Sequence, residues 1–130
     1  MESERADVSD ETMFGLCRSM PARFAAHGMD LFEKVSYDDL SAAIALSTDD
    51  CCFLIDRVRR SMLRDSHVLI QMVRKLAEQE PDARIFGVLL VGTTQGISSE
   101  FLRFGEKHHI ALLKPDNMAG FIKEKLEIKT

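Results

Sequence analysis

The chain has 130 residues, the length of one domain rather than of several. Hydrophobic residues make up 45% of it and charged residues 29%, a mixture that excludes a disordered or collagen-like protein. Its 17 Lys and Arg against 21 Asp and Glu give a formal net charge of −4, which excludes a histone-like polycation. A local basic patch remains compatible with this charge.

The cysteines and the apolar runs indicate the compartment. Cys17, Cys51 and Cys52 have no C-x-x-C spacing, so we expect neither a disulfide framework nor a structural zinc site. The first five residues carry two glutamates and no apolar segment, so no signal peptide is expected, and no apolar run approaches the roughly 18 residues that span a bilayer. These features predict a cytoplasmic domain with no membrane contact.

The N-terminal half begins with a polar, acidic segment, 1–11, which we expect to be disordered, followed by a single domain over 12–130. Apolar residues at three- and four-residue steps predict a helix from Thr12 to Gly28, capped by Asp10 or Thr12, which kinks or restarts at Pro21. The stretch 29–35 is interpreted as a short extended link.

The next stretch, 39–47, has two interpretations. Its alternating apolar residues are typical of a half-buried strand, whereas Ser36, two aspartates and an alanine-rich run could equally start a helix. A turn at 47–50 and a clear strand at 51–58 follow, so we favour a hairpin.

The C-terminal half predicts alternating helices and strands. A helix capped by Asp65 or Ser66 ends before Pro81, and Ser98 caps a later helix that runs to His108. The nearly continuous apolar run 85–91 predicts a central strand buried on both faces. The sequence then indicates a strand at 110–113 and a last amphipathic helix after Pro115. The expected fold is a three-layer α/β/α domain with a mixed sheet, an antiparallel hairpin followed by a parallel strand–helix–strand unit.

Two motifs have simple structural explanations. The loop from Gly92 to Ser98 could bind phosphate, but it matches neither dinucleotide nor P-loop spacing, so a plain strand-to-helix connection is favoured. His108 and His109 could bind metal, but no third ligand is spaced with them, and a cation also complements the end of a helix.

Two aspartates and four arginines are the main candidates for chemistry. In the predicted hairpin Asp39 and Asp56 approach each other across the strands, and paired carboxylates could hold Mg²⁺. Alternation places Arg57 and Arg59 on the face opposite Asp56, with Arg60 on the same face as Asp56. The arginines could bind DNA or RNA, or they could form a solvated edge; the full set is Arg57, Arg59, Arg60 and Arg64.

This arrangement resembles the restriction-endonuclease-like superfamily, the PD-(D/E)xK nucleases, and most of all its Mrr-like branch. The segment 37–40 is similar to the family's first-acid segment, 53–60 to its acid-x-Lys strand, and 87–113 to its strand, Thr-rich turn, helix and final strand. The resemblance implies a metal site at Asp39 and Asp56. It also implies a lysine two residues after the second acid, where this sequence has Val58.

Valine has no donor and no charge, so it cannot stabilise charge on a phosphate. The leading hypothesis is therefore a catalytically degenerate nuclease-fold domain that binds nucleic acid, a protein partner or a second copy of itself, without a cofactor. An alternative is an active Mg²⁺-dependent nuclease that uses Asp39 and Asp56 with a displaced basic residue such as Arg59. A third hypothesis, a small Rossmann-like binding subunit, requires a helix at 39–47.

Overall fold

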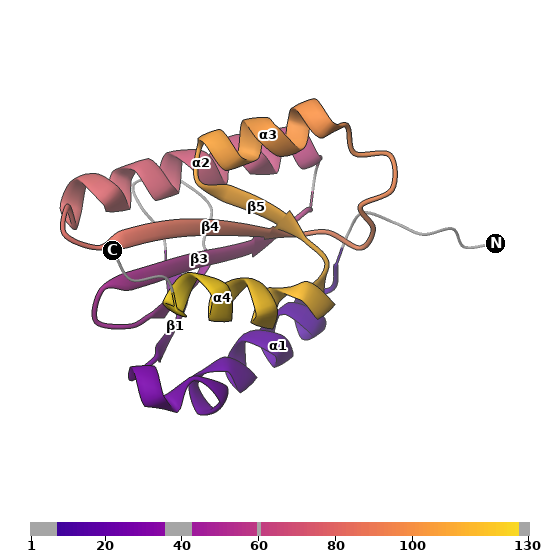
Figure 1. Ribbon diagram of the computed structural model, residues 1–130. Helices are drawn as coiled ribbons and strands as arrows, with labels where there is room; N and C mark the ends of the chain where they lie inside the picture. Colours follow the sequence, from indigo (N-terminus) through magenta and orange to yellow (C-terminus); the bar gives the residue numbers. More distant parts are fainter. Residues whose placement is uncertain (1–7, 36–42, 60, 128–130) are drawn as a thin grey trace.

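The computed structural model describes residues 8–35, 43–59 and 61–127. In this part of the chain five strands form one mixed sheet, with two helices on each face (Figure 1). The strands are β1 (Asp30–Val35), β2 (Ala43–Ser47), β3 (Cys51–Arg57), β4 (Arg84–Leu90) and β5 (Ile110–Leu113). The helices are α1 (Asp10–Arg23), α2 (Met62–Gln79), α3 (Ser99–Lys107) and α4 (Met118–Glu127), with short 3₁₀ turns at Ala25–His27 and Pro115–Asn117.

The strand order is β1-β2-β3-β4-β5. β1, β2 and β3 are antiparallel neighbours, whereas β3, β4 and β5 run parallel. This confirms the mixed α/β sheet, and it shows that Ala43–Ser47 is a strand; 39–42 lies outside the described residues. The helix that the Rossmann-like hypothesis needs is therefore absent from 43–47.

Two predictions about the sheet are corrected. β3 is its middle strand, and β4 lies between β3 and β5, so the apolar run 85–91 is interior but not central. The stretch 29–35 is not a simple link, because Asp30–Val35 forms the edge strand β1 beside β2. Phe32 on this strand is 52% exposed, which breaks the apolar alternation by which a strand is usually detected.

Two helices begin before their predicted starts. α1 begins at Asp10, because the Ser9 hydroxyl accepts a hydrogen bond from the Thr12 backbone N–H, and Val8 is already buried. Asp10 and Glu11, which were predicted to belong to the disordered segment 1–11, are therefore part of α1. α2 is capped by Ser61 in the same way, and the two residues predicted as its caps, Asp65 and Ser66, are buried within the helix.

The two faces of the sheet carry separate hydrophobic cores. α1 and α4 pack on one face, where Phe53 and Ile55 point, and α2 and α3 pack on the other, where Leu54 and Leu89 point. Gly87 of β4 allows close packing on the second face, because a Cβ there would lie 2.7 Å from Ile110 Cγ2. The described residues include no helix that is both long and apolar enough to cross a membrane.

Candidate functional site

The predicted second acid, Asp56, lies near the end of β3 at the carboxyl ends of the parallel strands. It pairs with Leu89 of β4 and is 3% exposed. Strand alternation turns its side chain away from Ile55 and toward the layer that contains α2. A buried carboxylate at this end of the strands requires hydrogen-bond partners from the same chain.

Arg59 supplies the charged partner of Asp56. β3 ends at Arg57, and the chain beyond it turns so that the Arg59 guanidinium Nη2 donates to Asp56 Oδ1. The same carboxylate oxygen accepts the Arg57 backbone N–H at 2.8 Å. The predicted alternation, with Arg59 on the face opposite Asp56, is wrong because the strand geometry stops two residues before Arg59.

A second buried carboxylate, Asp65 of α2, holds the same segment. Its Oδ2 accepts the Arg59 backbone N–H at 2.7 Å, and the residue is 3% exposed. Asp56, Arg59 and Asp65 form a cluster that we call the arginine clasp. The sequence identified Asp65 only as a helix cap, since nothing in its local pattern shows that it bonds the end of β3.

Burial dominates the electrostatics of Asp56. It raises the pKa of the Asp56 carboxyl above its ordinary value, while the hydrogen bonds from Arg59 and from the Arg57 backbone oppose the rise and the negative charge of Asp65 adds to it. The Arg59 guanidinium therefore offsets only part of the desolvation of this carboxylate.

Val58 occupies the position at which the resemblance implies lysine. Its side chain is 5% exposed and packs in the core between the sheet and α2. Its N–H donates to Leu90 O at 3.1 Å, which extends the ladder between β3 and β4. The position thus faces the same side of the sheet as Asp56, but it offers no donor to a phosphate.

The described residues do not by themselves assemble a magnesium site. In the described ranges 8–35, 43–59 and 61–127, no group of three or more His, Cys, Asp and Glu could hold a metal. Asp56 Oδ1 accepts two N–H groups, one of them from the cationic Arg59 side chain. Asp39, the other predicted ligand, lies outside the described residues.

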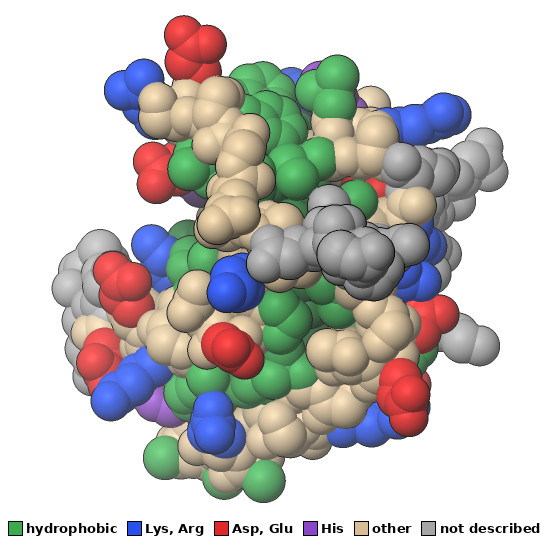
Figure 2. Space-filling view, turned by 90° about the vertical axis from the view of Figure 1, so that its right-hand side faces the viewer, with side chains coloured by type: hydrophobic (Ala, Val, Ile, Leu, Met, Phe, Trp, Pro, Cys, Tyr) green, Lys and Arg blue, Asp and Glu red, His purple; other side chains and the backbone are tan. Residues whose placement is uncertain are grey.

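The predicted arginine patch is divided between the two faces of the sheet. Arg57 points toward α1, where its Nε donates to Asp10 Oδ1 at 2.7 Å and its Nη1 to Val8 O at 2.9 Å. Arg64 is exposed on the first turn of α2, and Arg60 lies outside the described residues. Figure 2, which faces the carboxyl ends of the parallel strands, shows basic and acidic side chains interspersed rather than separated by sign.

The two remaining motifs lie at the two ends of α3. Gly92–Ser98 connects β4 to α3, and the Ser98 hydroxyl caps α3 by accepting the Phe101 N–H at 3.1 Å, as predicted. His109 follows α3 with φ +65°, and the described residues place no metal cluster around it or His108.

No protein-family model, curated protein or solved structure matches this chain.

Proposed function

We propose that this chain is a binding domain with a nuclease-like fold and no hydrolytic activity. In this proposal the Arg59 guanidinium pairs with the Asp56 carboxylate where a nuclease would hold a metal ion. The observation that supports the proposal is the arginine clasp. The guanidinium of Arg59 bonds the Asp56 carboxylate, and the buried Val58 stands where a catalytic lysine is needed. Among the described residues at this end of the strands, the lysine position is a buried valine and the Asp56 carboxylate is already bonded to Arg59.

The proposed partner is a protein. Nucleic-acid binding by Arg57, Arg59, Arg60 and Arg64 stays a prediction, but two of these arginines already bond carboxylates of the chain itself. Each of those bonds must be broken or shared before the arginine can bind a phosphate, which weakens electrostatic attraction. β1, in contrast, is an outer strand of the sheet over the described residues and exposes Phe32 and Glu33, and an edge strand is a common place for a partner chain to pair.

The test is a cleavage assay with the full chain. Supercoiled, linear and single-stranded DNA and a single-stranded RNA are incubated with the protein in Mg²⁺ or Mn²⁺. We expect no cleavage, and calorimetry should show no tight, stoichiometric binding of Mg²⁺. Cleavage that is abolished in the Asp56→Ala variant would overturn the proposal and favour the metal-dependent nuclease.

A further inference from the structure

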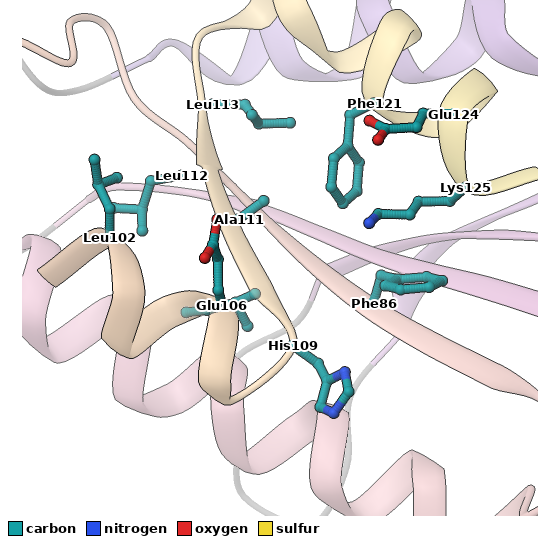
Figure 3. A pocket seen from close by; sticks show the side chains of 11 residues that line it. Phe86, Leu102, Glu106, His109, Ala111, Leu112, Leu113, Phe121, Glu124 and Lys125 are labelled. Atoms are coloured by element: carbon teal, nitrogen blue, oxygen red, sulfur yellow. The ribbon is translucent and has the colours of Figure 1, made fainter. Parts of the chain in front are cut away.

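The two outer strands of the described sheet, β1 and β5, differ in how far their edges are covered. On β5, Ile110 is 2% and Leu112 is 6% exposed, and a Cβ on Gly105 of α3 would lie 3.0 Å from Ile110 O. A groove of about 480 Å³ beside β5 lies between α3 and α4, and the carboxylates of Glu106 and Glu124 line it (Figure 3). These helices therefore leave β1 as the edge at which another strand could join the sheet.

β1 carries an exposed aromatic side chain. Phe32 is 52% exposed, and its register partner Ala45 belongs to the core on the α2 side of the sheet, so Phe32 lies on that side. The side chains before and after it lie on the α1 side, where Leu31 packs against the core and Glu33 Oε2 accepts a hydrogen bond from Arg18 Nε at 3.1 Å. An exposed ring on an outer strand is the kind of side chain that a cross-strand partner buries.

The turn between β2 and β3 determines which backbone groups of β2 face β1. The Thr48 N–H donates to Cys51 O at 2.8 Å, so the backbone of Thr48 faces β3. Consecutive residues of an antiparallel strand face opposite neighbours, so Ser47 and Ala45 direct their N–H and C=O groups to β1.

The same alternation determines which backbone groups lie at the outer edge of β1. Asp30 and Phe32 are the register partners of those two residues, so they bond β2. The N–H and C=O of Leu31 and the N–H of Glu33 therefore point away from the sheet. The register between β1 and β2 becomes irregular only after Phe32, so the irregularity does not change these directions.

We propose that β1 binds β1 of a second copy of this chain in antiparallel orientation, with Phe32 on the two-fold axis. In this dimer the Glu33 N–H of each copy donates to the Leu31 carbonyl of the other. The two Phe32 rings face each other in a non-hydrogen-bonded pair, the kind of pair in which opposite side chains lie closest. The inference rests on the proposed binding role and names its partner, a second copy of the chain.

The side chains of β1 select this axis. Outward-facing residues must pair with outward-facing residues, so the axis passes through Leu31, Phe32 or Glu33. An axis through Glu33 places two carboxylates directly opposite each other, which destabilises a strand pair, and an axis through Leu31 places Phe32 opposite Asp30 of the other copy. With the axis at Phe32, the two rings meet and Asp30 lies near position 34 of the other copy, which is a lysine in the sequence. Opposite charges therefore lie at both ends of the pairing.

The first test is the oligomeric state of the full chain, measured by sedimentation velocity from about 1 µM to about 1 mM. Only the run 30–34 of each copy takes part, which is short for a stable interface, so the dissociation constant should lie in the micromolar range. Phe32→Ser should raise it at least about tenfold. Leu63→Ser, the matched change at the other large hydrophobic side chain that is exposed among the described residues, should leave it within about twofold. Circular dichroism should show that both variants fold, because both side chains are more than half exposed.

A pair of cysteine variants tests the axis itself. In the proposed register the Cα atoms of the two residues at position 32 lie about 4.5 Å apart, which a disulfide can span, whereas those at position 30 lie about 14 Å apart. Phe32→Cys should therefore form a disulfide-linked dimer on oxidation, detected on a non-reducing gel, and Asp30→Cys should not. The three native thiols are buried and do not compete.

The proposal is overturned if the chain stays monomeric up to about 1 mM, a result that would leave β1 to a strand from a different protein. It is also overturned if Phe32→Ser and Leu63→Ser change dimerisation equally, or if Asp30→Cys crosslinks as readily as Phe32→Cys. None of these outcomes bears on hydrolysis, so the cleavage assay still decides the proposed function separately.

Discussion

Replacing Arg59 with alanine removes the guanidinium from the buried Asp56 carboxylate and should destabilise the fold at neutral pH. Removing one partner of a fully buried ion pair costs about 3–5 kcal/mol. Here the Arg59 side chain is 34% exposed and Asp56 keeps the Arg57 backbone N–H, so we expect a smaller loss, about 1–3 kcal/mol in the free energy of unfolding at pH 7.

The loss should depend on pH with a defined sign. The folded pKa of Asp56 is raised, so folding favours its protonated form, and the free energy of unfolding falls as pH rises from the ordinary Asp value through the folded pKa. Arg59→Ala raises that pKa further. The difference between the wild type and Arg59→Ala should therefore be small in acid, where Asp56 is protonated in both, and largest near pH 7.

The assay is urea unfolding followed by circular dichroism between pH 4 and pH 8, with a double-mutant cycle. In an Asp56→Asn background Arg59→Ala should cost less than about 0.5 kcal/mol, because residue 56 then carries no charge that the guanidinium could pair. An equal loss in both backgrounds, or a loss that does not change with pH, would refute the view that Arg59 acts on the Asp56 carboxylate.

Three further predictions address the core, the thiols and the arginines. Leu89→Ala should lower the free energy of unfolding by about 2–5 kcal/mol, because Leu89 is fully buried. Leu63→Ala, at a side chain that is 57% exposed, should change it by less than about 0.5 kcal/mol, and equal losses in urea unfolding would contradict the burial of β4. Burial raises the pKa of the Cys17 thiol to about 12 and also raises the pKa values of the Cys51 and Cys52 thiols on β3. Ellman's reagent at pH 8 should therefore react with none of the three thiols until the protein is denatured, and rapid reaction of the native protein would show that the buried thiols become exposed. If the arginines bind nucleic acid, log K should fall with log salt with a slope of about −2 to −4, and Arg64→Ala should reduce that slope by about one unit; no affinity at low salt would end the nucleic-acid prediction.

The interior strands were predictable because burial leaves a pattern in the sequence. The runs in β3 and β4 are apolar on both faces, and Ser98 caps α3 as its position indicates. β1 was not predictable in this way. An edge strand is held by backbone hydrogen bonds on one side only, and its exposed Phe32 and Glu33 break the periodicity.

Asp56, Val58 and Arg59 were predictable as members of the candidate site, whereas Asp65 and the contacts within the cluster were not. Asp56 and Val58 share a face because strand alternation holds as far as the ladder continues. Arg59 lies beyond the end of β3, where alternation no longer applies, and its backbone bond with Asp65 joins the β3–α2 connection to α2. The groove beside β5 is likewise a tertiary feature, since its walls come from α3 and α4 and no local motif marks it.

The arrangement of the two cores has a consequence for synthesis of the chain. α1, the first described helix, shares its layer with α4, the last, and the core between them includes Met20 of α1 and Ile122 of α4. The opposite core is formed by α2, α3 and the sheet and includes no residue of α4, so its contacts do not depend on that helix. Until α4 is made, the apolar face of α1 and one face of the sheet stay uncovered, a surface of the kind that chaperones bind and that favours aggregation. The newly made chain is thus exposed to aggregation until α4 has packed against α1.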